Sequence, residues 1–182
     1  MKPLSSHRFR LVLSLLALTF IPRIALAQGF SLYDNIQQLE SRIKQAGDTT
    51  LVINFWATWC KPCVEELPHF DELKDHYPGQ NIQILLVSLD FKSQLELNFL
   101  PFLRAHNIKS EVALLADQDV NTWMPLIYED WDGAIPATIV LQGSKRSFSL
   151  GKFDSLEELD AFVQPFLVDV SREMKPVTCG GK

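Results

Sequence analysis

Residues 51–56 read LVINFW, a near-continuous apolar run that predicts a strand covered on both faces of a sheet. Two cysteines, Cys60 and Cys63, follow directly. The segment 63–77 then carries apolar residues three positions apart and is followed by a Pro-Gly pair, which predicts a helix and its end. The cysteines are therefore expected where a buried strand turns into a helix, and this junction constrains the fold more than any other feature.

The same alternation continues along the chain. Helical spacing and a capping pattern predict further helices at residues 34–46, 94–106 and 155–167, with an interruption of the second at Pro101. Apolar and alternating runs predict strands at residues 82–89, 111–116, 137–142 and 145–150, of which the last two flank Gly143-Ser144 as a hairpin. This order predicts a three-layer α/β sandwich, with a mixed, mostly parallel central sheet and helices on both faces.

The first 27 residues have the composition of an export signal. They contain four basic residues and no acidic one, then the apolar run LVLSLLALTFI, then Ala-Leu-Ala before Gln28. This order predicts a secretory signal peptide cut after Ala27 and a periplasmic protein. The apolar run ends at Pro22 and is short for a membrane helix, which takes about 20 apolar residues. An uncleaved membrane anchor is the alternative.

The predicted organisation is a signal peptide at 1–27, one domain at 28–167 and a tail at 168–182. Removal of the signal leaves 13 basic and 22 acidic residues, a net charge of −9. An acidic surface disfavours nucleic acid and anionic membranes as partners. The tail contains the third cysteine, Cys179, an odd thiol in an exported chain that we expect to be free.

The position of the cysteine pair favours thiol chemistry. The first N–H groups of a helix are unpaired and carry partial positive charge, which stabilises a thiolate at Cys60. Cys63 lies on the same helix face, close enough for a disulfide, and Pro62 suits a first turn that needs no N–H donor from it. Closing so small a ring removes only roughly 2 kcal/mol of unfolded-state entropy. Such a disulfide is better placed for exchange than for holding the fold.

Three other uses of a cysteine pair are less consistent with the sequence. Structural disulfides usually join distant segments. Zinc would need a second pair of ligands, and outside the pair and the signal the chain offers only Cys179, His69, His76 and His106 as Cys or His ligands. Covalent haem attachment needs His directly after the second cysteine, where Val64 stands. We therefore predict no metal site and no cofactor beyond the redox-active disulfide.

Two motifs carry a family resemblance. NFWATWCKPC resembles the active-site motif of thioredoxin-fold proteins, and WATWCKPCVEELP resembles more specifically the exported TlpA/ResA-type thiol–disulfide oxidoreductases. WDGAIPAT resembles the family's Ile-Pro segment, in which a cis proline faces the dithiol. The resemblance covers roughly residues 31–167 and implies a thioredoxin-like sandwich. It also implies that Ile135, Pro136 and Trp59 form the substrate-binding surface beside the cysteines.

One position departs from thioredoxins proper. They carry an acid two residues before the Trp of the strand, and this chain has Asn54 there, which cannot exchange a proton in the working pH range. Glu66 is the candidate replacement, because a helical wheel places it inside the apolar arc while Glu65 faces the polar side. From the pattern alone Glu66 is equally an ordinary first-turn acid. The resemblance, which has Glu three residues after the second cysteine, favours a partly buried, functional acid, whose pKa burial would raise.

Other residues near the motifs have two interpretations each. Lys61 is expected, with Pro62, to tune the pKa of the Cys60 thiol, because a cation favours the thiolate, and Thr58 is a weaker candidate. The aromatic residues before Pro136 either line a partner groove or cover the sheet. They are Trp123, Tyr128 and Trp131.

The predicted function is dithiol–disulfide exchange with protein substrates in the periplasm, by a monomer in which Cys60 attacks and Cys63 resolves. The resemblance implies reduction, in cytochrome c maturation or thiol maintenance, with a membrane electron donor. A binding module is the alternative from another class, for instance a copper chaperone that uses the pair and a third ligand. A disulfide oxidase or isomerase is a further alternative, which the reduction potential distinguishes.

Overall fold

The structure, a computed structural model, describes residues 29–167. The predicted signal peptide, its cleavage after Ala27, the tail at 168–182 and Cys179 lie outside these residues. Within residues 29–167, none of the helices has the length and apolar character needed to cross a membrane.

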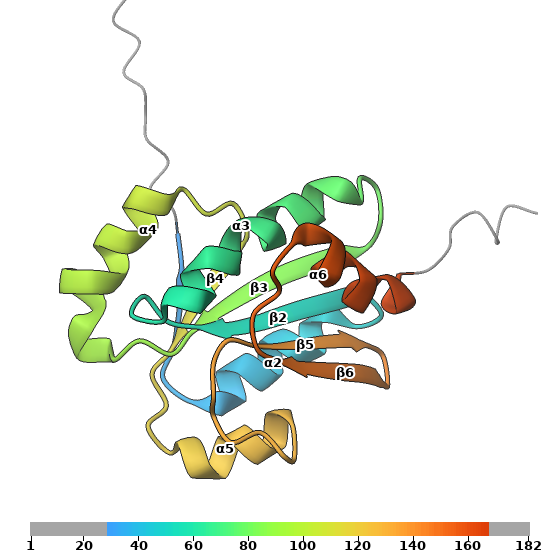
Figure 1. Cartoon of the computed structure of the whole chain (residues 1–182). Coiled ribbons are helices and arrows are strands. Elements are labelled where there is room, and N and C mark those ends of the chain that lie inside the picture. Colours follow the sequence, from blue (N-terminus) through green and yellow to red (C-terminus); the bar gives the residue numbers. More distant parts are fainter. Residues whose placement is uncertain (1–28, 168–182) are drawn as a thin grey trace, which may run out of the picture.

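A six-stranded sheet forms the centre of the molecule (Figure 1). Its order is β1-β4-β3-β2-β5-β6; the first four strands are parallel to one another, β5 is antiparallel to β2, and β6 is antiparallel to β5. The strands are β1 (Ser31–Tyr33), β2 (Thr50–Trp56), β3 (Ile82–Ser88), β4 (Glu111–Leu115), β5 (Ala137–Gln142) and β6 (Lys145–Leu150). The predicted mixed, mostly parallel sheet is confirmed.

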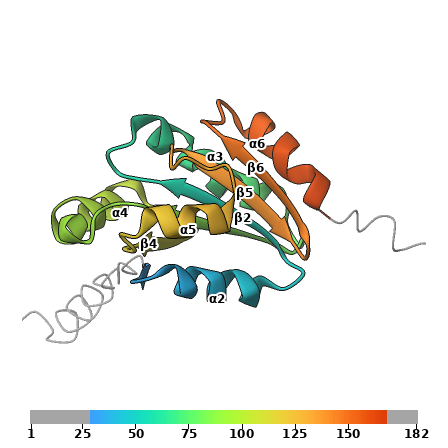
Figure 2. The ribbon, with the colours of Figure 1, turned by 90° about the horizontal axis from the view of Figure 1, so that it is seen from below.

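Helices cover both faces of this sheet. The α-helices are α2 (Ile36–Ala46), α3 (Lys61–His76), α4 (Leu100–His106), α5 (Val120–Ile127) and α6 (Leu156–Val163). Side chains of α3, α4 and α6 belong to one apolar core, and those of α2 and α5 to a second core on the opposite face. Figures 1 and 2 show α2 on the side of the sheet opposite α3 and α6. The predicted three layers are therefore present.

The central position of β2 in the sheet explains its run of apolar residues. Val52 and Trp56 belong to the core under α3, whereas Leu51, Ile53 and Phe55 belong to the core under α2 and α5. Successive side chains of a strand point to opposite faces, so a central strand with helices on both sides is apolar at nearly every position. β2 leads into α3 and places the cysteines at the C-terminal end of a central strand.

Two elements were not predicted, and the helix predicted at 94–106 differs from the prediction in its first half. β1 and α5 were not predicted, because β1 has only three residues and α5 contains Pro125 in an aromatic-rich segment. In the helix predicted at 94–106, Pro101 does not interrupt. A 3₁₀ turn (Lys92–Gln94) and a π turn (Leu95–Phe99) come first, and Pro101 lies in the first turn of α4, where no N–H donor is needed from it.

The closing helix begins as predicted. Ser155 caps α6 and accepts a hydrogen bond from the backbone N–H of Glu158, and a 3₁₀ turn (Gln164–Phe166) follows the helix.

The aromatic segment before Pro136 packs onto the sheet. Trp123 and Trp131 are buried and pack with Phe55 in the second core. These two tryptophans therefore cover the sheet, and Trp123 also lines a pocket of about 520 Å³ together with Leu89 and Val120.

Candidate active site

The cysteine pair lies at the junction of β2 and α3, as predicted. The backbone N–H of Cys60 donates to the carbonyl of Ala57 at 3.1 Å, which closes a turn between the strand and the helix. Cys60 caps α3, and its Sγ accepts from the backbone N–H of Cys63 at 3.3 Å. The two residues form a disulfide with their Cα atoms 5.3 Å apart.

The two sulfur-bearing residues differ in access to solvent. Cys60 is 6% exposed and Cys63 is 0% exposed, while Trp59, directly before the pair, is 64% exposed. Only Cys60 therefore presents any surface to a partner. An exposed Trp beside a reactive sulfur provides apolar contact area for a polypeptide.

The Ile-Pro segment lies beside the reactive cysteine. The peptide bond between Ile135 and Pro136 is cis, as predicted, and the carbonyl oxygen of Ile135 lies 3.8 Å from the Sγ of Cys60. Ile135 is half-buried and Pro136 is buried. The predicted substrate-binding residues Trp59 and Ile135 are thus both adjacent to Cys60, whereas Pro136, predicted to belong to the same surface, is buried.

The two residues between the cysteines are positioned differently from each other. Pro62 lies in the first turn of α3, as predicted. The side chain of Lys61 is exposed, and its ammonium lies 3.9 Å from the carboxylate of Glu65. Solvent and this neighbouring negative charge weaken the field of Lys61 at the cysteine sulfur. The geometry gives the predicted pKa-tuning role of Lys61 little support.

Glu66 is fully buried on α3, one turn beyond Cys63. Its Oε1 accepts from Asn54 Nδ2 and its Oε2 accepts from the backbone N–H of Phe153, both at 2.8 Å. Burial raises the pKa of Glu66 from 4.5 to about 7, although both hydrogen bonds and the charge of Lys152 act to lower it. The predicted burial and raised pKa are confirmed, and Glu66 can exchange a proton near neutral pH.

Asn54 links Glu66 to the neighbouring strand. Its Nδ2 also donates to Thr138 Oγ1 at 3.0 Å, whereas its buried Oδ1 has no hydrogen-bond partner in the described part of the chain. The side-chain amide has a donor end and an acceptor end. In the observed orientation it donates to the Glu66 carboxylate and favours the ionised form of Glu66.

Sequence reasoning missed a second buried acid, Asp90, which is 2% exposed and follows β3. Its carboxylate accepts from the backbone N–H and the hydroxyl of Thr58 and from the hydroxyl of Ser88. The available signal was its position, because an acid directly after a buried parallel strand lies at the same sheet edge as the residues after β2.

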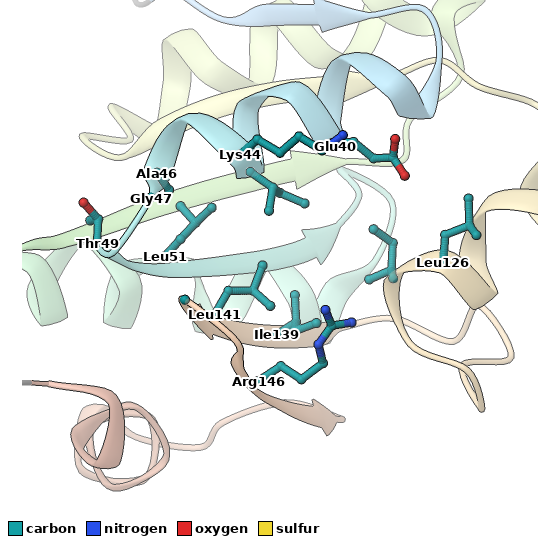
Figure 3. A pocket seen from close by; sticks show the side chains of 13 residues that line it. Glu40, Lys44, Ala46, Gly47, Thr49, Leu51, Leu126, Ile139, Leu141 and Arg146 are labelled. Carbon is teal, nitrogen blue, oxygen red and sulfur yellow. The ribbon is translucent and has the colours of Figure 1, made fainter.

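No candidate metal cluster lies around the dithiol in the part of the chain that the structure describes. Residues 29–167 contain no group of three His, Cys, Asp or Glu side chains arranged to hold a metal ion. A pocket of about 200 Å³ lies elsewhere, between α2, α5 and the β5–β6 hairpin, with Lys44 and Arg146 among its lining residues (Figure 3). Neither cysteine lines it, so a partner of the dithiol would bind at the surface around Cys60.

Curated relatives match about a third of the chain. Thiol-disulfide oxidoreductase ResA from Bacillus cereus is 34% identical over 62 residues, 34% of each chain. ResA from Geobacillus thermodenitrificans is 34% identical over 74 residues, 38% of this chain and 42% of that protein. The matched region thus spans well under half the length of these relatives.

A solved structure and a family comparison extend the match to most of the domain. The thiol:disulfide interchange protein, thioredoxin family protein, of Chlorobium tepidum TLS has a TM-score of 0.54 at 17% identity, with 67% of this chain and 82% of that chain covered. The fold is therefore thioredoxin-like. The AhpC/TSA family matches residues 25–145, more than half of the 182 residues. This chain belongs to the AhpC/TSA family.

Proposed function

We propose that this protein is a thiol–disulfide oxidoreductase that reduces disulfides of protein substrates in the periplasm. The observation that carries the proposal is the asymmetry of the pair, because Cys60 reaches the surface beside Trp59 and the carbonyl of Ile135 while Cys63 is fully buried. Such an arrangement suits one attacking sulfur and one resolving sulfur. The relatives named thiol-disulfide oxidoreductase support the same chemistry.

The proposed reaction has two steps. The thiolate of Cys60 attacks one sulfur of a client disulfide, which forms a mixed disulfide and releases the client's other sulfur as a thiolate that takes a proton from water. The thiol of Cys63 then loses its proton and attacks the sulfur of Cys60. This step forms the Cys60–Cys63 disulfide and releases the second client thiolate. Two electrons pass from the pair to the client.

Glu66 is the proposed acceptor of the proton from Cys63. The two residues are three positions apart on α3, both fully buried, and the pKa of Glu66 of about 7 is suited to proton transfer at neutral pH. We further propose that the protein acts as a monomer without another cofactor, and that a membrane donor returns electrons to the pair. Its roles would be cytochrome c maturation or thiol maintenance. The predicted signal at residues 1–27 supports the periplasmic location.

Trapping of the mixed disulfide tests the proposal. All variants carry Cys179→Ser, so that only the pair can react. Cys63→Ser removes the resolving sulfur and is expected to accumulate mixed disulfides with protein substrates on Cys60, resolved by non-reducing electrophoresis. The matched variant Cys60→Ser is expected to trap none and to lose reduction of insulin disulfides. A protein with the intact pair that reduces no insulin disulfide, together with a Cys63→Ser variant that traps nothing, would refute the function.

The direction of exchange is tested by the equilibrium of the pair with glutathione. A pair that stays oxidised at a strongly reducing glutathione ratio has the low potential of a reductase. A pair that is reduced at a mildly oxidising ratio would instead make the protein an oxidase or isomerase.

A further inference from the structure

The turn before Cys60 is contacted by a side chain from another part of the chain. The turn runs from Ala57, whose carbonyl accepts from Cys60, and contains Thr58 and the exposed Trp59. The end of β2 is tied to the residue after β3, because Leu89 donates to the carbonyl of Trp56 at 2.8 Å. Figure 1 shows β2 and β3 side by side where β2 leads toward α3. The segment after β3 is therefore within reach of the turn.

Asp90 makes that contact with both polar groups of Thr58 that can donate. Its Oδ2 accepts from the backbone N–H at 2.9 Å, and its Oδ1 accepts from the hydroxyl at 2.6 Å. The hydroxyl of Ser88 donates to Oδ2 at 2.7 Å, and the backbone N–H of Asp90 donates back to that hydroxyl at 3.0 Å. Asp90 itself is thus held in place at the end of β3.

Neutral hydrogen-bond donors offset the loss of hydration that the Asp90 carboxylate undergoes on burial. Among the ion pairs between residues 29 and 167, none includes Asp90, so its three hydrogen bonds replace the water that it loses. An apolar residue would avoid that cost. A buried acid whose two oxygens both contact the residue two positions before Cys60 is therefore best explained by what it does to the turn.

We propose that Asp90 is a positioning residue for Cys60: by holding Thr58 it fixes the turn Ala57–Cys60 and keeps the Cys60 sulfur at the first N–H groups of α3, beside the carbonyl of Ile135. This inference rests on the proposed exchange function, in which Cys60 is the attacking sulfur. A turn without this anchor lets the sulfur leave the N–H group of Cys63, and the thiolate loses the stabilisation that the helix start provides.

The chain offers a matched control for a purely structural anchor. Asp71, on α3, accepts from the backbone N–H groups of Lys109 and Ser110 and from the hydroxyl of Ser110. Its carboxylate thus accepts from backbone and hydroxyl donors as that of Asp90 does, but Asp71 lies eleven residues along the helix from Cys60, which is about 16 Å at roughly 1.5 Å per residue. Its loss should affect stability without affecting the sulfur.

The test measures alkylation of Cys60 by iodoacetamide at a pH below the pKa of its thiol, in a Cys63→Ser, Cys179→Ser background where Cys60 is the remaining thiol. Thr58→Val keeps the shape and the backbone N–H of Thr58 but removes the hydroxyl donor to Asp90. We expect alkylation to slow on the order of tenfold, because a rise of about one unit in the pKa of the Cys60 thiol lowers the fraction of thiolate by that factor. Thr58→Ser, which keeps the hydroxyl, should restore most of the rate.

A double-mutant cycle identifies Asp90 as the partner. In an Asp90→Ala background, which lacks both carboxylate oxygens, Thr58→Val should have little further effect, because the hydroxyl of Thr58 has already lost its acceptor. Unfolding by urea is measured for every variant, and Asp71→Asn is expected to lower stability while alkylation proceeds at the parent rate. If Thr58→Val lowers stability as Asp71→Asn does and leaves the alkylation rate unchanged, Asp90 is only a structural anchor and the inference is wrong.

This outcome is separable from failure of the proposed function. Alkylation needs no protein substrate, whereas the function is tested by insulin reduction with the intact pair. Absence of insulin reduction by the intact pair, together with a Cys63→Ser variant that traps no substrate, would refute the function. A tenfold effect of Thr58→Val on alkylation, with rescue by Thr58→Ser, would still support the positioning of the sulfur by Asp90.

Discussion

Two buried acids flank the dithiol, and they differ in their hydrogen-bond partners. Asp90 contacts the turn before Cys60 and accepts three hydrogen bonds, two of them from Thr58. Glu66 lies one turn beyond Cys63 and accepts two, from Asn54 and from the backbone N–H of Phe153, and burial raises its pKa to about 7. The comparison teaches that burial alone does not assign a role to an acid. One carboxylate anchors backbone, and the other can exchange a proton.

A second contrast separates Glu66 from its sequence neighbour. Glu65 lies on the solvent side of α3, where its carboxylate forms ion pairs with Lys61 at 3.9 Å and Lys152 at 3.1 Å. One residue along a helix turns the side chain by about 100°. Glu65 is therefore a natural control for every substitution of Glu66.

The largest expected effect concerns stability against pH. Between pH 4.5 and about 7 Glu66 is ionised in the unfolded chain but still protonated in the folded protein, so the free energy of unfolding falls as pH rises. The total fall is about 3 kcal/mol, at about 1.4 kcal/mol per pKa unit. Glu66→Gln should remove this fall, as measured by urea unfolding of the oxidised protein from about pH 4 to pH 8.

Glu65→Gln is the control, and it should keep the slope of the parent protein. Parallel curves for the parent and for Glu66→Gln would mean that Glu66 does not titrate in this window. The proposed proton transfer from Cys63 would then lose its acceptor.

A smaller effect is expected for Asn54→Val. The hydrogen bond from Asn54 acts to lower the pKa of Glu66, so its removal should raise that pKa further above 7. Carboxyl ¹³C NMR of Glu66 against pH measures the shift directly. Thr138→Val removes the partner at the other side of Asn54 and leaves the hydrogen bonds of Glu66 in place, so it should shift the pKa less. A fall of the pKa in Asn54→Val would contradict the assigned role of this hydrogen bond.

The smallest effect is expected for Lys152→Gln. Lys152 lowers the pKa of Glu66 through its charge alone, from a partly solvent-accessible position where it also pairs with Glu65 and Asp154. The pKa of Glu66 should therefore rise only slightly, and salt should reduce the difference from the parent protein. The same NMR titration at low and high ionic strength measures it. A shift as large as that of Asn54→Val would show that charge, and not hydrogen bonding, dominates the cluster.

Local patterns in the sequence were sufficient for much of the fold. The apolar run of β2, the spacing in α3 and the hairpin of β5 and β6 each predicted an element that the structure contains. These features depend on periodicity and turn chemistry within a few residues. β1 and α5 lacked such a signal, since one is short and the other contains Pro125, and packing on the sheet decides both.

The sequence by itself determined where the dithiol lies and that Cys60 starts a helix, while the burial of Glu66 was only favoured, by the family resemblance. Only the tertiary structure decided which groups meet around them. The carbonyl of Ile135 reaches Cys60 from 75 residues away, the N–H of Phe153 reaches Glu66 from 87, and the carboxylate of Asp90 reaches Thr58 from 32. Periodicity assigns a side chain to a face of its own helix or strand. Which donor or acceptor opposes it depends on the order of the strands β3-β2-β5 and on the loops that leave them, because hydrogen bonds form only within about 3 Å.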